Sequence, residues 1–411
     1  MKFLAFALLT VCALPVVSLS AKPKVSAESE AAGNPSRDDV VRLQIFLDEQ
    51  NFSPGKIDGR YGGFTAKSWQ RYQTLQGVNP PVDKFDAKTF TAVEPVYVTY
   101  KVAPDDLAAI GQVPKELALQ AKGKALPYTS MAELLGERYH VGVDFLRQLN
   151  AGKNLDQLKE GTEVKVPNVV PPFNLSQVLA LRSYTAEREK AIKAAKEAKA
   201  AGKKKDETPG ASPAASPPEE MPGPTVPISA VAPPPSAIPP VPKPGAESAV
   251  PSPSPADAAA TVDNRPVLRA TPANSSRLVF HVNTTTNYLE VRNDGDKLVA
   301  CFPITPGSKS IPTPKGEWHV VAKTLLPEFR WDKSVLMTGK RSNVFYQLPP
   351  GPNNPVGVCW IALNKPGIGM HGTAEPDTIG RAASHGCIRL SNWDAFKVYG
   401  MVAPNTKVII E

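Results

Sequence analysis

The sequence predicts a multidomain protein made of a small all-α domain, a small α/β domain, a proline-rich linker and a mostly-β C-terminal domain. Three observations lead to this prediction. The 44 prolines among 411 residues concentrate in one region, which marks a linker rather than a fold. Apolar residues near the N-terminus recur at helical spacing. Apolar residues after about residue 275 instead alternate along short strands, with turn residues between them.

The first 21 residues have the pattern of a secretory signal peptide. Met1-Lys2 gives a short positive start, residues 3–17 form an apolar run too short to span a bilayer comfortably, and residues 18–21 are small enough for cleavage. We therefore expect an exported protein of the periplasm or cell wall, with no membrane span after cleavage. An uncleaved N-terminal anchor is the alternative. The net charge of +8 suits an anionic partner surface, and the absence of a nucleic-acid motif argues against nucleic acid.

Residues 38–95 are predicted to form the all-α domain. A helical pattern begins after a possible cap at Asp38, a turn-rich loop follows, and a second helix starts at Thr65. The stretch LQIFLDEQNFSPGKIDGRYGGFTAKSWQRYQ resembles the small three-helix peptidoglycan-binding domain. This resemblance implies cell-wall binding. The alternative is that the glycines only shape a tight loop between helices.

Residues 96–170 are predicted to form the α/β domain. The pattern indicates a strand over residues 97–102, helices over 131–139 and 143–149, and a strand over 164–167. The stretch LNAGKNLDQLKEGTEVKVPN resembles the end of a LysM module, which implies binding to glycans that contain N-acetylglucosamine. Residues 103–127 depart from that family, which has only a few residues between its first strand and first helix. A small packing domain is the alternative.

Two further segments join these domains to the C-terminal part. Residues 174–205 are rich in Ala, Lys and Glu and predict a basic helical spacer with a solvated surface, although contact with an anionic wall polymer is an alternative. Residues 206–270 are predicted to be a disordered linker whose prolines favour extended polyproline II. Such a linker would reach on the order of 100–150 Å, and we expect it to act as a semi-rigid spacer.

Residues 275–411 are predicted to form a mostly-β sandwich or a barrel-like sheet. A hairpin turn at residues 293–296 separates two strands, residues 392–399 form a helix, and residues 407–410 form a closing strand. His281 and His319 are expected to be ordinary histidines of the sheet.

The cysteines single out one thiol. Cys12 belongs to the signal, and the remaining Cys301, Cys359 and Cys387 cannot all pair within one chain. Cys301 and Cys359 lie in apolar strand runs, where cysteine is usually an inert small hydrophobe. Cys387 stands between His385-Gly386 and Arg389, so we expect it to be the reactive thiol.

A thiol needs a base, because only the thiolate is nucleophilic. His371 comes from a separate segment that is free to aim its ring at the sulfur of Cys387, so we prefer it to the nearer His385 as general base. The imidazole could take the proton and hold the thiolate as an ion pair. The other ring nitrogen needs an acceptor, and a backbone carbonyl near Gly372 is one candidate.

The residues around Cys387 have supporting roles in this prediction. The amides of Gly386 and Cys387 are candidate oxyanion donors, and Ser384 is expected to hold His385 in place. Arg389 suits a substrate carboxylate, with a surface salt bridge as the alternative. A zinc site made by two of the histidines and Cys387 is a further alternative. We expect no metal and no cofactor.

The C-terminal domain, over residues 276–411, resembles the L,D-transpeptidase catalytic domain of the YkuD family. HGT followed by SHGCIRL is that family's signature, and TPGSKSIPTPKGEW and PPGPNNPVGVCWIALNKPGIGMHGT support it. The resemblance implies a cysteine enzyme whose partner is peptidoglycan. It makes Cys387 the nucleophile and His371 the base, with Gly372, Ser384, His385, Gly386 and Arg389 in support. A capping loop is expected over residues 328–350.

The implied reaction is acyl transfer. The cysteine attacks the L,D-peptide bond of a tetrapeptide stem, releases D-alanine and passes the acyl group to an amine. The alternatives are hydrolysis of the same acyl-enzyme, as in an L,D-carboxypeptidase, and a non-catalytic wall-binding scaffold. We expect a monomer.

Overall fold

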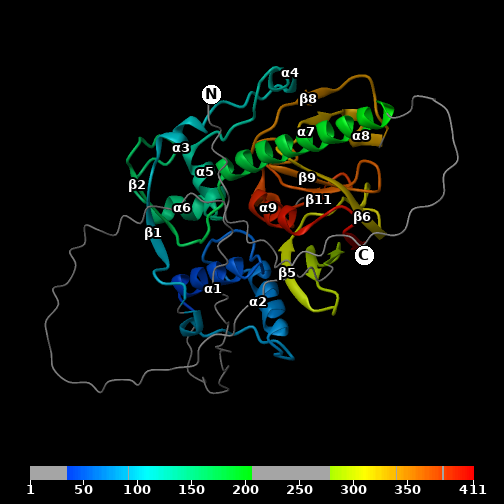
Figure 1. The fold of residues 1–411 in the computed structure, drawn as a ribbon. Coiled ribbons are helices and arrows are strands. Elements are labelled where there is room, and N and C mark those ends of the chain that lie inside the picture. The colour runs from blue at the N-terminus through cyan, green and yellow to red at the C-terminus, as the bar shows by residue number, and fades with distance from the viewer. Residues whose placement is uncertain (1–34, 91, 206–277, 339, 382–383) are drawn as a thin grey trace, which may run out of the picture. The chain divides into compact units, whose positions relative to one another are not determined.

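The computed structural model describes residues 35–90, 92–205, 278–338, 340–381 and 384–411 (Figure 1). The predicted signal, residues 1–21, and the predicted linker, residues 206–270, lie outside the described residues. The chain divides into two compact units: one contains Met1–Thr185 and Val267–Glu411, and the other contains Ala186–Pro266. Among the described helices, none combines the length and the hydropathy that crossing a membrane would require.

The N-terminal part is helical, as predicted, with α1 over Arg37–Glu49, α2 over Gly63–Leu75 and the 3₁₀ helix η1 over Ala87–Phe90. The predicted cap at Asp38 is wrong. Ser36 caps α1 instead, because its hydroxyl accepts the Asp39 amide while the Asp39 carboxylate accepts the Ser36 amide. This reciprocal pair satisfies two amides that α1 leaves unbonded at its start.

The buried side chain of Gln44 holds the loop between α1 and α2. Its amide nitrogen donates to Asp58, Arg60 and Thr65 at 3.0–3.2 Å. Its oxygen accepts the backbone amides of Asp58 and Gly59 at 3.1 and 2.9 Å. The LQ pair and the glycine-rich loop of the sequence therefore form one hydrogen-bonded unit, which gives both motifs a structural role.

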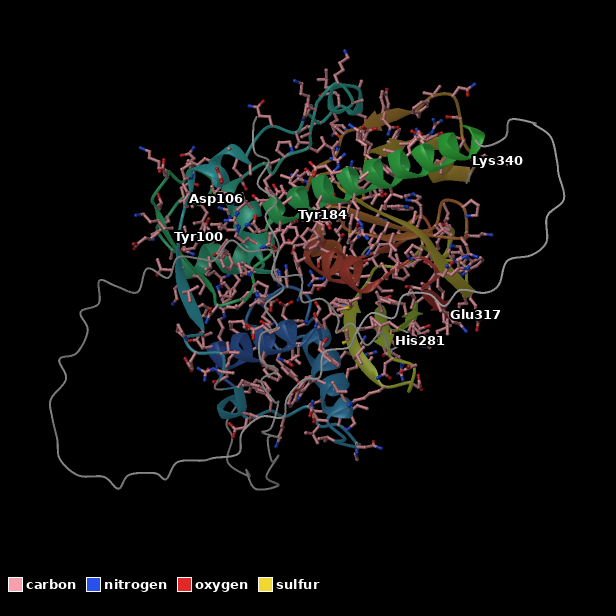
Figure 2. The ribbon with its side chains drawn as sticks, in the orientation of Figure 1. Tyr100, Asp106, Tyr184, His281, Glu317 and Lys340 are labelled. Carbon is pink, nitrogen blue, oxygen red and sulfur yellow. The ribbon has the colours of Figure 1, made fainter. Side chains whose placement is uncertain are left out.

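A second small part contains β1 (Tyr97–Lys101), which pairs antiparallel with β2 (Glu163–Pro167), and the helices α5 (Met131–Arg138) and α6 (Val143–Leu149). These four elements fall where the sequence predicts them. The inserted segment adds α3 (Pro104–Ala108) and α4 (Leu117–Gln120). Tyr100 of β1 donates a hydrogen bond to buried Asp106 of α3, so the insertion is tied to the sheet (Figure 2).

The C-terminal part contains an eight-stranded sheet in the order β11-β10-β9-β6-β12-β3-β4-β5. The strands are β3 (Val279–Asn283), β4 (Tyr288–Arg292), β5 (Leu298–Pro303), β6 (Gly316–Leu325), β9 (Cys359–Leu363), β10 (Gly369–His371), β11 (Ile388–Arg389) and β12 (Lys407–Ile410). The start of β6 pairs with β12 and its end pairs with β9, with an irregularity between Val320 and Ala322. Such an irregularity bends a strand. The domain is therefore mostly β, as predicted, and consists of one mixed sheet that curls at β6.

One face of this sheet is covered by helix α9 (Asn392–Met401), with a buried apolar cluster between them (Figure 1). His281 and His319 lie on β3 and β6, as predicted. A small flap of β7 (Phe329–Trp331), α8 (Lys333–Thr338) and β8 (Tyr346–Leu348) occupies the region expected for the capping loop. The 3₁₀ helix η2 (Pro376–Thr378) follows β10.

Helix α7 spans Leu175–Lys205, where the sequence predicts a solvated helical spacer. The first turns of α7 differ from that prediction. Val178 is fully buried in the core of the C-terminal domain, and Phe173, just before the helix, packs edge-on against Phe396 of α9 at 5.8 Å between ring centroids. The start of α7 is therefore an anchor for the core.

The N-terminal parts contact the C-terminal domain directly, within one compact unit. Asp48 at the end of α1 accepts hydrogen bonds from Lys397 of α9 at 2.9 Å and from His140 at 2.8 Å. Ser53 donates to Asp394 of α9 at 2.9 Å. These contacts are buried or half-buried. The predicted role of residues 206–270 as a spacer stays a prediction, since these residues lie outside the described ranges.

Candidate active site

The register of β10, β11 and β9 brings the predicted catalytic residues together. β10 pairs parallel with β11, and His371 lies opposite Arg389. Cys387 lies in the bend that leads into β11, and the charge of Arg389 acts on the pKa of both the Cys387 thiol and the His371 imidazole. On its other side β10 pairs with β9, and Trp360 lies opposite His371. A thiol, an imidazole and a guanidinium group thus gather near the β11 edge of the sheet.

His371 is buried and is fixed from two sides. Its Nδ1 lies 2.6 Å from the carbonyl oxygen of Gly372, and a carbonyl can only accept, so Nδ1 carries the proton. The free lone pair is therefore on Nε2. The Trp360 ring stacks on the imidazole at 5.4 Å with an interplanar angle of 21°. Burial lowers the pKa of His371 to about 4, and the charge of Arg389 acts in the same direction. His371 is thus a neutral base at neutral pH.

The thiol of Cys387 lies over the backbone that leads into β10. Its Sγ is 3.4 Å from the carbonyl oxygen of Gly367, which requires a protonated thiol as donor. Burial raises the pKa of Cys387 above its ordinary value, while the Gly369 amide and Arg389 lower it in part. Thiol and imidazole are therefore both neutral before substrate binds. The thiolate–imidazolium pair suggested by the sequence is not the state that these environments favour.

The turn before Cys387 is built by Ser384 and Gly386. Gly386 has φ of 103°, a backbone conformation that favours glycine. The buried Ser384 hydroxyl donates to the Cys387 carbonyl at 2.5 Å and accepts the Gly386 amide at 3.2 Å. Two predictions are therefore corrected: Ser384 orders the turn rather than His385, which is exposed, and the Gly386 amide is already engaged. The Cys387 amide remains as the predicted oxyanion donor.

A second segment holds the other side of this turn. Thr305 and Arg389 exchange backbone hydrogen bonds at 2.9 and 3.0 Å. Ser384 donates its amide to the Pro306 carbonyl and accepts the Ser308 amide, both at 2.9 Å. The TPG segment of the sequence is thus a scaffold for the cysteine loop.

Arg389 is half-buried and carries the positive charge of the site. Across the described residues, no carboxylate lies within ion-pair distance of its guanidinium group. The predicted alternative, a surface salt bridge, is therefore not seen. A free guanidinium group beside the thiol suits an anionic substrate group.

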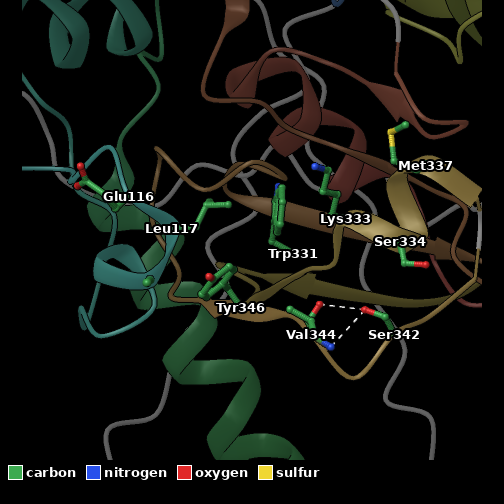
Figure 3. Close-up of a pocket in the computed structure, with 10 residues that line it drawn as sticks. Glu116, Leu117, Trp331, Lys333, Ser334, Met337, Ser342, Val344 and Tyr346 are labelled. Atoms are coloured by element: carbon green, nitrogen blue, oxygen red, sulfur yellow. Dashed lines mark hydrogen bonds between the residues drawn. The ribbon is translucent and has the colours of Figure 1, made fainter.

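A separate cavity of about 710 Å³ lies between the inserted segment and the flap (Figure 3). It is lined by Glu116 and Leu117 beside α4, and by Trp331 and Tyr346 of β7 and β8. Neither Cys387 nor His371 lines it. The flap is joined to the inserted segment here, since the Leu126 amide donates to the Pro350 carbonyl at 2.9 Å.

Several residues of the site escaped the sequence analysis. Trp360 stacks on His371, and Asn392 packs against Gly372, where a Cβ atom would lie 2.2 Å from the Asn392 side-chain oxygen. Gly369 must lack a side chain because a Cβ atom would lie 2.8 Å from the Trp360 ring. If the pairing of β9 with β10 had been known, Trp360 would have been expected beside His371. Nothing in the sequence pattern pointed to Asn392 or to Gly369.

No group of three His, Cys, Asp or Glu side chains in the described ranges is arranged to hold a metal ion.

The comparison with protein families matches residues 277–410 to the YkuD family, described as the L,D-transpeptidase catalytic domain. YqjB of Bacillus subtilis, provisionally named an L,D-transpeptidase, is 30% identical over 134 residues, which cover 68% of its length. The chain belongs to this family. In the alignments with YqjB and with a second Bacillus relative described below, the aligned residues make up 31–33% of this chain.

Two further similarities concern the same YkuD-family region. YkuD of Bacillus licheniformis, also provisionally named an L,D-transpeptidase, is 31% identical over 134 residues, and the aligned part covers 64% of its length. The solved L,D-transpeptidase from Mycobacterium smegmatis is 23% identical, with a TM-score of 0.27 over 33% of this chain and 58% of that one. The chain thus spans somewhat less than two thirds of these two proteins.

Proposed function

We propose that this chain is an L,D-transpeptidase that acts on peptidoglycan through an acyl-enzyme on Cys387. The observation that carries the proposal is the fixed imidazole of His371. Its Nδ1 donates to the Gly372 carbonyl, so its Nε2 is a free acceptor, in the strand next to β11, which Cys387 directly precedes. Family membership supports the choice of substrate class.

In the first half of the reaction, Cys387 Sγ attacks the carbonyl carbon of the L,D-peptide bond in a tetrapeptide stem. Nε2 of His371 accepts the thiol proton as the C–S bond forms. The tetrahedral intermediate then collapses, the C–N bond breaks, and His371 returns the proton to the leaving nitrogen of D-alanine. A thioester on Cys387 remains.

In the second half, an amine attacks the thioester carbonyl, and His371 Nε2 takes the proton that this nitrogen loses. The new amide forms as the C–S bond breaks, and the proton returns to the sulfur. Arg389 would hold a carboxylate of the stem; the lack of an ion-pair partner for its guanidinium group among the described residues supports this role. The oxyanion would be held by the Cys387 amide.

The test is to incubate the full chain with disaccharide-tetrapeptide and to read the products by mass spectrometry. Cross-linked dimers with released D-alanine are the expected result. Trimmed monomers alone would show hydrolysis, as in an L,D-carboxypeptidase, and would contradict amine transfer. Absence of turnover would favour a wall-binding scaffold and would overturn the proposal. The matched control is Cys387→Ala.

We further infer that the chain works outside the cytoplasm and that its N-terminal parts bind wall polymer. The signal-like residues 1–21 and the resemblances of residues 38–95 and 96–170 support this inference. Sedimentation of Cys387→Ala with insoluble peptidoglycan tests binding without turnover. N-terminal sequencing of the exported protein tests cleavage. A protein that stays in the supernatant would contradict wall binding, and an exported protein with its first 21 residues intact would contradict cleavage.

A further inference from the structure

The side-chain amide of Asn392, the first residue of α9, joins the segments that support His371. Its oxygen accepts the Val358 amide at 3.1 Å. A Cβ atom on Gly372 would lie 2.2 Å from this oxygen, and one on Gly357 would lie 2.0 Å from it. The Asn392 oxygen therefore sits directly against the backbone of Gly372, with no room for either glycine to carry a side chain.

Gly372 in turn supplies the carbonyl that orients His371, at 2.6 Å from Nδ1. The Gly372 amide donates to the Cys359 carbonyl at 3.3 Å. Asn392 on one side and Cys359 on the other thus hold the peptide that sets the tautomer of the imidazole. Any displacement of Asn392 would shift this peptide and the ring that depends on it.

The other end of the Asn392 amide is held by a residue from the N-terminal part of the chain. Asn392 Nδ2 donates to Oε2 of Glu137 at 2.7 Å, and Glu137 Oε1 accepts the hydroxyl of Tyr128 at 2.6 Å. Both hydrogen bonds are buried. Glu137 is in α5, more than 250 residues before Asn392 in the chain. An unpaired carboxyl would be costly in this position, but here each oxygen has one partner.

We propose that Glu137 is a positioning residue for the reaction: it fixes Asn392 against Gly372, so that the Gly372 carbonyl holds His371 with its proton on Nδ1. This inference rests on the proposed function of His371. It assigns the LysM-like part a role inside the enzyme in addition to any role in binding the wall.

The protonation state of Glu137 makes glutamine a suitable isosteric substitution for testing the proposal. Burial raises the pKa of Glu137 to about 8, so that a neutral carboxyl is present at neutral pH. In the ionised form Oε1 accepts the Tyr128 hydroxyl; in the neutral form Oε1 can carry the proton and donate it to that hydroxyl oxygen, while Oε2 accepts from Asn392 in both forms. Glutamine reproduces this pattern, because its oxygen accepts and its nitrogen donates.

The experiment compares Glu137→Leu, Glu137→Asp and Glu137→Gln in the full chain with disaccharide-tetrapeptide as substrate. Glu137→Leu should lower kcat by roughly 10-fold to 100-fold, the range that a misplaced catalytic group gives, with KM within about twofold of the unaltered value. Glu137→Asp is too short to reach Asn392 well and should lower kcat in the same way, by a smaller factor. Glu137→Gln should keep kcat.

A second measurement reads the positioning directly. Long-range proton–nitrogen correlation spectra of chain labelled with ¹⁵N-histidine report the tautomer of His371, whose signal is identified by its loss in His371→Gln. The Nδ1-protonated form should persist in Glu137→Gln and be lost or mixed in Glu137→Leu and Glu137→Asp. This readout does not require turnover, so it remains decisive if the proposed function fails.

The matched control is Arg71→Gln, which removes the half-buried Arg71–Glu290 ion pair of 2.8 Å between α2 and β4. That contact also joins an N-terminal helix to the C-terminal domain, but it lies five strands from β10. Arg71→Gln should change neither kcat nor the tautomer. The proposal is overturned if Glu137→Leu and Glu137→Asp keep both kcat and the tautomer, or if Arg71→Gln alters them as strongly.

Discussion

The two ends of the eight-stranded sheet each carry a cysteine in a different environment. At the β5 end, Cys301 is fully buried, and its backbone exchanges hydrogen bonds with Asn51 and Ser53 at 2.9 Å, which covers the edge strand. At the β11 end, Cys387 is half-buried and lies just before β11, the strand in which Arg389 pairs with His371 of β10. The same side chain is a packing element at one edge and a candidate nucleophile at the other.

This difference shows what the sheet contributes to reactivity. Around Cys301, burial raises the pKa of the thiol far above its ordinary range, although the charge of Arg71 and the Ser68 hydroxyl, 4.0 Å from Sγ, act in the opposite direction. Around Cys387 burial also raises the pKa, with a guanidinium group and a backbone amide opposing it, and a neutral imidazole is present in the neighbouring strand. The neighbouring base and the partial exposure of the thiol are what separate Cys387 from Cys301.

The largest expected effect is the loss of turnover when Cys387, rather than Cys301, is replaced by alanine. Cys387→Ala should lower turnover of disaccharide-tetrapeptide by more than about 10³-fold, because the covalent step is lost. Cys301→Ala should keep kcat within about twofold and lower only the stability. Steady-state kinetics with product mass spectrometry measure both. Equal loss of turnover in Cys387→Ala and Cys301→Ala would contradict the proposed difference between the two cysteines.

The next effect concerns the contact of the N-terminal helices with α9. Asp48 is buried between Lys397 and His140, so Asp48→Ala leaves a buried charge without its partner and should lower the free energy of unfolding by about 3 kcal/mol. Urea denaturation measures this value.

The control for that change is Asp156→Ala, which removes an exposed ion pair with Arg147. It should cost less than about 1 kcal/mol. If Asp48→Ala cost no more than Asp156→Ala, the buried contact would not stabilise the docked arrangement.

A further prediction concerns pH and stability. The pKa of His371 falls from its ordinary value of 6.5 to about 4 in the folded chain, so the unfolded chain binds a proton first as the pH falls. Stability should therefore be lost between about pH 6.5 and pH 4, by about 3 kcal/mol in total from this group. Chemical denaturation of the unaltered chain and of His371→Gln, at pH 7 and pH 4.5, isolates this contribution. If the free energy of unfolding changed equally between pH 7 and pH 4.5 in the unaltered chain and in His371→Gln, the assigned contribution of His371 would be contradicted.

The smallest expected effect is on substrate binding. Arg389→Gln should raise KM for the tetrapeptide by roughly 10-fold, through loss of a charge-assisted hydrogen bond to a carboxylate. For Arg389→Gln, the KM for a stem with a free carboxylate should be close to the KM for a stem whose carboxylate is amidated. An equal change of KM for both stems would show that Arg389 does not recognise that group.

The sequence predicted the local elements better than their assembly. The helices around Gln44, the strands of residues 97–101 and 163–167, and the helix that begins at Asn392 follow from periodicity and turn residues. The curl of the sheet did not follow, because it depends on an irregularity within β6 that has no glycine or proline signal. The contacts between the N-terminal part and α9 did not follow either, because the proline content of a linker says nothing about them.

The candidate site shows the same division. Motif spacing selected Cys387, His371 and Arg389; the structure pairs His371 with Arg389 and has Cys387 in the bend before β11. It misassigned Ser384, whose hydroxyl bonds within the turn, because side-chain hydrogen bonds depend on backbone geometry. Glu137 could not have been found, since its link to Asn392 arises only from the docking of two distant segments.

The most direct test of the central claim is the alkylation rate of each cysteine in the native full chain as a function of pH. Iodoacetamide and peptide-resolved mass spectrometry would measure it. The account predicts that Cys387 reacts much faster than Cys301, and that its rate rises about tenfold per pH unit from pH 7 to pH 9, as a protonated thiol requires. Comparable rates at Cys301, or a rate at Cys387 that stays flat from pH 5 to pH 9, would contradict it.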